Sequence, residues 1–168
     1  MPTIHPLQEL IDAHDAVVPL LQNIPDDAMD WTLSESEWSL RRVIGHLAHA
    51  NDFYVMIVEE ARRSNFSSVD LNQELQGKQR MQQTDDEIRA ATTVAALFES
   101  FERAFARLLR VLQTIAEHEL DAVFEMTERA RTKMTTLRER VFAAAVQHFA
   151  EHTPQLTQTL ARWQAQQQ

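Results

Sequence analysis

Two histidines lie four residues apart near the end of the chain, in the stretch VQHFAEHTPQL that covers residues 146–156. On a helix, residues four apart differ by about 40° in direction and lie about 6 Å apart along the axis. His148 and His152 can therefore point into one volume and bind one cation. Among seven histidines, about 0.25 such pairs are expected by chance, so the spacing alone is a weak signal.

The surroundings of this pair strengthen the signal. Val141, Ala145 and Leu156 share the apolar stripe of the two histidines at helical spacing, which predicts that both imidazoles face the interior. A buried imidazole without a partner costs about 1–3 kcal/mol, and two adjacent ones repel each other when protonated. A bound cation would remove both costs.

A third histidine lies about a hundred residues earlier. His46 falls on the inward face of its expected helix, with Val43, Ala50 and Phe53 at helical spacing. Three imidazoles from two facing helices would leave coordination positions open for water or substrate, as catalytic metal sites do. We therefore predict His46, His148 and His152 as metal ligands, and we assign no catalytic residue.

Two other interpretations of these histidines compete with a catalytic centre. Core histidines bonded to polar neighbours would make the chain a metal-free bundle. The letters HFAEH also match a metallopeptidase pattern that needs a glutamate further downstream. None of the sixteen residues after His152 is acidic, which excludes the peptidase.

Other polar residues near the three histidines have weaker cases. His49 could substitute as a ligand, but its direction favours the flank of the helix. Hydrogen-bond partners that orient the imidazoles are expected, and the nearest candidates are Asn51, Glu151 and Gln155. The remaining histidines, His5, His14 and His118, look like surface or helix-end residues. For His14, a polar contact in the interior stays open as an alternative.

Four long segments with helical periodicity must position these side chains. They cover about residues 6–22, from Ser36 or Ser39 to 63, from Thr92 or Thr93 to 118, and from the capping box at Thr136 onward. Residues 64–83 read as a polar connection, Thr84 as the start of a short capped helix, and the stretch up to residue 134 as irregular. The prediction is an all-α four-helix bundle forming a single domain over residues 1–168, with a long crossover between helices two and three.

Composition excludes several classes of protein. The net charge is −9 and basic residues are scattered among acids, so nucleic acid is not an expected partner. Cysteine is absent, which rules out disulfides and thiolate ligands. The N-terminal residues do not resemble a signal peptide, and no apolar run approaches membrane-spanning length. We expect a cytoplasmic protein without a membrane partner.

Two motifs carry a family resemblance that extends over nearly the whole chain. WSLRRVIGHLA, residues 38–48, and HxxxHxxQL, from His148 to Leu156, resemble the helix-two and helix-four signatures of DinB-like (YfiT-like) metal-binding four-helix bundles. The resemblance implies an up-down-down-up bundle that binds a divalent metal, often zinc or nickel, through His46, His148 and His152. It also implies that homodimers are common and that DNA is not contacted. Some relatives are thiol-dependent transferases or isomerases that use mycothiol, bacillithiol or glutathione, and others are described as hydrolases.

Two functions follow as hypotheses. The first is a metal-dependent enzyme that transfers a low-molecular-weight thiol or hydrolyses a small substrate. The second is a non-catalytic metal-binding or stress-linked interaction bundle. Neutral imidazoles favour zinc or nickel, with iron(II) as a further candidate, over magnesium or calcium.

Overall fold

The computed structural model describes residues 6–32 and 34–168. This part of the chain is mostly helical, with six α-helices and a small three-stranded sheet. The helices are α1 (Pro6–Gln22), α2 (Leu40–Arg63), α3 (Gln76–Ala90), α4 (Val94–Leu112), α5 (Glu117–Leu120) and α6 (Ala144–Gln166). A 3₁₀ turn (Asp26–Ala28) follows α1, and a π-helical segment (Arg138–Ala143) leads into α6. The strands are β1 (Ser68–Asp70), β2 (Phe124–Glu128) and β3 (Arg131–Thr135).

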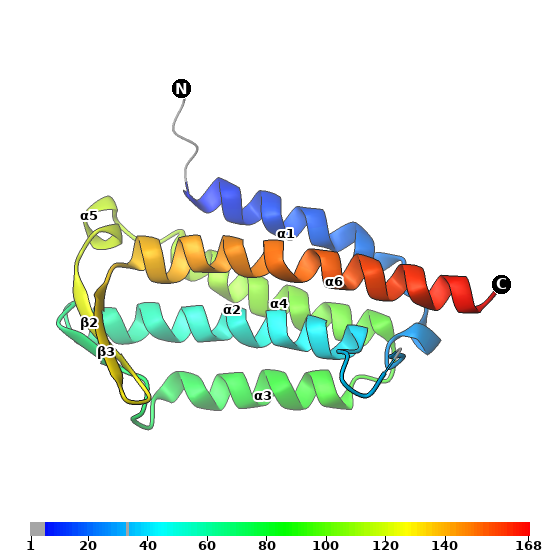
Figure 1. Ribbon diagram of the computed structural model, residues 1–168. Coiled ribbons are helices and arrows are strands. Elements are labelled where there is room, and N and C mark those ends of the chain that lie inside the picture. Colours follow the sequence, from blue (N-terminus) through cyan, green and yellow to red (C-terminus); the bar gives the residue numbers. More distant parts are fainter. Residues whose placement is uncertain (1–5, 33) are drawn as a thin grey trace.

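Helix α2 lies at the centre of the fold and packs against α3, α4 and α6, while α1 packs against α6 and α4. In Figure 1, α2 and α4 run in one direction, whereas α1, α3 and α6 run in the other. Helix α4 has a clear amphipathic repeat, and its buried face includes Leu97, Phe101, Phe105, Leu108 and Leu112. These side chains meet the apolar residues of α2 and form the core. None of the helices in the described ranges is long and apolar enough to cross a membrane.

Hydroxyl side chains begin three of the helical segments where the sequence predicts them. Ser39 accepts a hydrogen bond from the backbone N–H of Arg42 at 3.2 Å, and Thr93 accepts one from Ala96 at 3.2 Å. Thr136 does the same for the backbone N–H of Glu139 at 3.2 Å. Each cap satisfies a donor that the first helical turn leaves free.

Helix α3 begins eight residues before the expected short helix, so the polar connection predicted over residues 64–83 is partly helical. Thr84 lies in the middle of α3 and is not a cap. The sequence gives a weak signal here because α3 buries only Gly77, Thr84 and Ile88, which leaves little apolar periodicity. An added Cβ at Gly77 would overlap the side chain of Met56, so this glycine lets α3 approach α2 closely.

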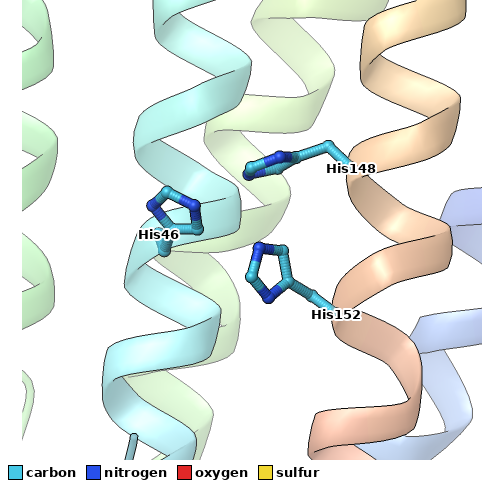
Figure 2. Close-up of side chains that lie close together, drawn as sticks. All are labelled: His46, His148 and His152. Atoms are coloured by element: carbon cyan, nitrogen blue, oxygen red, sulfur yellow. The ribbon is translucent and has the colours of Figure 1, made fainter.

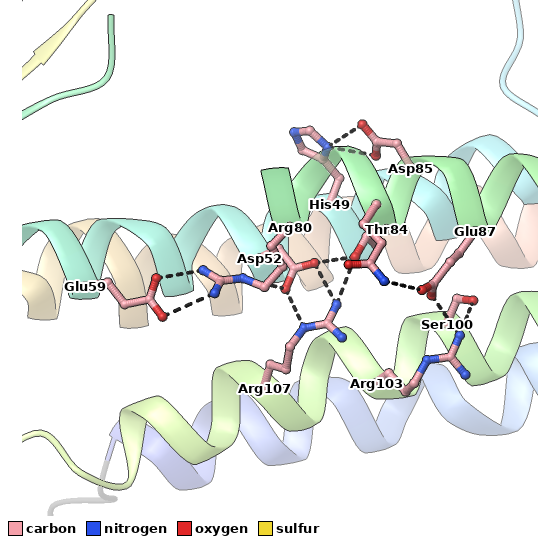
Figure 3. Close-up of polar contacts among 11 residues, drawn as sticks. His49, Asp52, Glu59, Arg80, Thr84, Asp85, Glu87, Ser100, Arg103 and Arg107 are labelled. Atoms are coloured by element: carbon pink, nitrogen blue, oxygen red, sulfur yellow. Dashed lines mark hydrogen bonds and ion pairs between the residues drawn. The ribbon is translucent and has the colours of Figure 1, made fainter. Parts of the chain in front are cut away.

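Polar contacts hold α3 against α2 and α4 (Figure 3). Asp52 is 0% exposed, and its carboxylate accepts two hydrogen bonds from Arg107 at 2.8 and 2.7 Å. The hydroxyl of Thr84 donates to the same carboxylate at 2.5 Å. Arg80 adds an ion-pair contact at 3.7 Å to Asp52 and pairs with Glu59 at 2.8 Å. This network fixes α3 on the other two helices.

A small sheet covers the end of the fold where α2 ends and the last helix begins (Figure 1). β1 pairs parallel with β2, and β2 pairs antiparallel with β3, with Met126 opposite Lys133. Phe124 and Met126 alternate inward on β2, whereas β3 is exposed along most of its length. The all-α prediction is therefore wrong for this segment, because one strand with two buried residues carries too short an alternation to stand out. Helix α4 also ends at Leu112, six residues before the predicted end.

Candidate metal centre

The structure brings the three predicted histidines together. His46 comes from α2, while His148 and His152 lie one turn apart on α6, and the three rings face one another across the space between the helices (Figure 2). The ring centroids are 4.6 Å apart for His46 and His148, 4.9 Å for His46 and His152, and 4.7 Å for His148 and His152. One nitrogen of each ring lies within 4.8 Å of the other two. The three side chains form a cluster that could hold a metal ion.

The size of the cluster fits a first-row divalent cation. A tetrahedral zinc ion with bonds of about 2.1 Å to nitrogen holds its ligand atoms about 3.4 Å apart. The distances between the ring nitrogens would have to shorten by at most about 1.4 Å to reach that spacing. Small rotations of the side chains can produce such a change. Within the described residues, no fourth histidine, aspartate or glutamate joins the three. A cation held by these three side chains alone would have at least one further coordination position.

The surroundings of His46 and His148 favour the neutral form of these two imidazoles, which is the form that binds a metal. Burial, reinforced by the neighbouring imidazoles of His46 and His152, lowers the pKa of His148 to about 4. Burial also lowers the pKa of His46, with the nearby charges of His152, His49 and Arg42 acting in the same direction. At neutral pH both rings therefore present a lone pair to the shared space.

An unpaired nitrogen identifies the position that a cation would fill. Nε2 of His148 is buried and has no hydrogen-bond partner within the described part of the chain. Such a group costs about 1–3 kcal/mol when it is left unpaired. A metal ion among the three rings would accept its lone pair, so the residues present fit a bound cation.

Gln155 fixes the ring of His152. The side-chain oxygen of Gln155 lies 2.6 Å from Nδ1 of His152, and an amide oxygen can only accept. Nδ1 must therefore carry the proton, which leaves the lone pair of His152 on Nε2. The sequence predicted Gln155 as an orienting neighbour, and the contact confirms it.

The other two expected neighbours make no hydrogen bond to the three imidazoles in the described part of the chain. Glu151 is exposed and accepts a hydrogen bond from Gln147 at 2.7 Å, and Asn51 makes no hydrogen bond to any of the three imidazoles in the described structure. His49 turns to the flank of α2, as predicted, where it meets Asp85 on α3. The interior contact left open for His14 is present: its ring is buried, stacks on Phe105 and lies 2.9 Å from Glu102. His118 is exposed on α5, and His5 lies outside the described residues.

Trp38 forms a wall of the cluster, a role that the sequence alone did not assign. Its indole stacks on His152 at 5.7 Å with an interplanar angle of 10°, and it meets His46 edge-on at 5.0 Å. The guanidinium of Arg42 lies over the Trp38 ring, 4.6 Å from its centroid. A tryptophan placed just before the cap of the helix that carries His46 is the signal that could have revealed this contact.

A polar hollow of about 350 Å³ lies beside Trp38 and Gln155. Glu37 and Arg162, paired at 3.0 Å, form one side of it. The remaining lining side chains are hydroxyls and amides: Ser36, Gln158 and Thr159. None of the three histidines lines this hollow, but Trp38 and Gln155, which do, also contact His152.

Comparison with known protein families agrees with this geometry. The model of the DinB superfamily matches residues 9–164, and the chain therefore belongs to that superfamily. A comparison with curated proteins finds no match. The family assignment and the three-histidine cluster rest on separate observations, one of sequence and one of structure.

Proposed function

We propose that His46, His148 and His152 bind one divalent cation, zinc or nickel, and that the resulting centre is catalytic. The reaction proposed is either the transfer of a low-molecular-weight thiol or the hydrolysis of a small substrate. The observation that carries this proposal is the set of three converging, half-buried imidazoles, which no other histidine, aspartate or glutamate joins among the residues that the structure describes. A structural zinc site, by contrast, is normally closed by four protein ligands.

A divalent cation would polarise a bound oxygen or sulfur and lower the pKa of a coordinated water or thiol. The protein's own side chains supply the setting for that chemistry. Gln155 holds His152 in one tautomer, and Trp38 covers one side of the cluster and restricts the access of water. Hydroxyl and amide groups around the polar hollow can bind the polar part of a substrate.

The fold supports the same assignment. We propose that α1, α2, α4 and α6 form an up-down-down-up bundle, with α3 as an additional helix in the crossover between α2 and α4. The parallel course of α2 and α4 in Figure 1 supports this description. It places the first and last long helices side by side and lets α2 face α6 at the cluster.

Metal analysis of the purified protein tests the proposal. Wild type is expected to carry close to one equivalent of zinc or nickel after exposure to the ions and gel filtration. His148→Ala is expected to lose it, and His118→Ala, which changes an exposed histidine far from the cluster, is expected to retain it. Equal metal content in wild type and His148→Ala would refute the centre.

A cobalt-substituted protein separates the catalytic from the non-catalytic function. Addition of 2-mercaptoethanol should produce a sulfur-to-cobalt charge-transfer band, because an open position accepts a thiolate. A cobalt spectrum that does not respond to the thiol or to azide would indicate a closed site, and the alternative of a non-catalytic metal-binding bundle would then be favoured.

A further inference from the structure

A histidine–carboxylate pair lies between α2 and α3, about one helical turn along α2 from His46, and is not part of the three-histidine cluster. Nδ1 of His49 on α2 is 2.9 and 3.0 Å from the two carboxylate oxygens of Asp85 on α3 (Figure 3). The two side chains are 38% and 33% exposed, so the pair is reachable from solvent.

This contact determines which nitrogen of His49 can accept a proton. An ionised carboxylate only accepts hydrogen bonds, so Nδ1 of His49 must carry a proton. The lone pair of the neutral ring is then on Nε2, which has no hydrogen-bond partner among the described residues. A histidine oriented by a carboxylate, with its second nitrogen free, is the arrangement of a general base.

The position of His49 on α2 places it near the cluster. It lies three positions after His46, which corresponds to about one turn of the helix and about 60° around its axis. His49 therefore flanks the three-imidazole site on the side of α3.

Asp85 is held in place by the buried network described above. Its neighbour in the chain, Thr84, donates to Asp52, and Arg107 clamps the same carboxylate from α4. These contacts fix α3 against α2 and so fix the carboxylate that orients His49. Surface charge pairs without such support gain little energy and hold their geometry poorly.

We propose that His49 is the general base of the centre and that Asp85 is the residue that positions it. This inference rests on the proposed function and names one residue of its proton chemistry. In hydrolysis, Nε2 of His49 takes a proton from the attacking water, either directly or through one intervening water. The water oxygen forms a bond to the acyl carbon, the bond from that carbon to the leaving oxygen breaks, and the leaving group departs with the electron pair. The imidazolium, held through Nδ1–H by Asp85, then returns its proton to solvent.

Paramagnetic NMR of the cobalt-loaded protein tests the location of His49 without any reaction. Cobalt broadens or shifts the ring-proton signals of nearby histidines steeply with distance, so the signals of His49 should change strongly and those of His118 should not. The ring nitrogens of His49 should also report the Nδ1–H tautomer in wild type, and Asp85→Asn should reduce that preference.

Hydrolysis of 4-nitrophenyl acetate by the zinc-loaded protein tests the role of His49. His49→Gln is expected to lower the zinc-dependent rate about 100-fold, the lower end for loss of a general base, with unchanged zinc content. Asp85→Asn should show a smaller loss of the same kind. Asp86→Asn is the matched control, because Asp86 is the next residue of α3 and pairs only with surface groups of its own helix.

Rescue by an external base distinguishes chemistry from structure. The base 2,6-lutidine, whose nitrogen is too hindered to bind the metal well, should restore part of the rate of His49→Gln in proportion to its concentration and should leave wild type unchanged. A loss of rate without rescue, equal rates in wild type and His49→Gln, or cobalt-insensitive His49 signals would overturn the role of His49. Failure of the protein to bind metal, or hydrolysis that is independent of zinc, would overturn the proposed function itself.

Discussion

Asp52 is the side chain whose loss should affect the stability of this protein most clearly. In Asp52→Ala, the guanidinium groups of Arg107 and Arg80 lose the carboxylate that they share, and the hydroxyl of Thr84 loses its acceptor. Removal of one partner from a buried ion pair typically costs about 3–5 kcal/mol. Because Arg107 and Arg80 are 29% and 27% exposed, water can reach them in part, and we expect the lower end of that range, about 3 kcal/mol.

Chemical denaturation followed by far-UV circular dichroism measures this change. A loss of about 3 kcal/mol is a large part of the 5–15 kcal/mol that stabilises a typical domain, and it should lower Tm by roughly 6–12 °C for a chain of this size. Asp86→Ala removes an exposed carboxylate from the same region of α3 and should cost less than about 0.5 kcal/mol. A loss below about 1 kcal/mol for Asp52→Ala would refute the argument that this network holds α3 in place.

Three further changes test other parts of the structure. The pKa of His148 is about 4 in the folded protein, so the unfolded chain takes up a proton that the folded one lacks between about pH 6.5 and pH 4. The unfolding free energy of the metal-free protein should therefore fall as pH is lowered through this range, and His148→Phe should flatten that dependence in urea titrations at several pH values. Trp38→Ala should weaken zinc binding about tenfold in competition with a chromophoric chelator, because it removes the ring stacked on His152. Gly77→Ala should destabilise the protein by about 1–3 kcal/mol in thermal unfolding, since the clash with Met56 exceeds the gain of about 1 kcal/mol in helix propensity; an unchanged Tm would contradict the close approach of α2 and α3.

The parts of the fold that could be predicted from sequence are those where apolar periodicity and helix caps coincide. Helices α1, α2 and α4 combine a buried stripe with recognisable ends, and Ser39 and Thr93 cap two of them as expected. Helix α3 could not be predicted at its true length because ion pairs and close backbone contact hold it, and neither produces periodicity. The hairpin escaped prediction for a related reason, since β3 has only one buried residue.

The meeting of the three imidazoles could be predicted because helical spacing fixes the direction of each side chain. Their role as metal ligands stays a prediction. Contacts between distant segments could not be predicted in the same way. Trp38 contacts His152, which lies 114 positions later in the sequence, and His49 on α2 contacts Asp85 on the neighbouring helix α3. The position of Trp38 before a helix cap is a weak local signal for the first contact, and no local pattern marks the second.

The π-helical segment Arg138–Ala143 has a consequence for the direction of the two C-terminal imidazoles. Each residue of a regular helix advances the side-chain direction by about 100°, and a π turn accommodates one residue more than an α turn. A chain shortened by one residue here would keep all three histidines and would gain a regular helix. His148 and His152 would then keep nearly the same direction relative to the hairpin, because a regular turn covers with one residue fewer the rotation that the π turn covers. The π turn can therefore lose its extra residue without changing the aim of the rings, whereas a deletion in the regular part of α6 before His148 would turn both rings by about 100° away from His46.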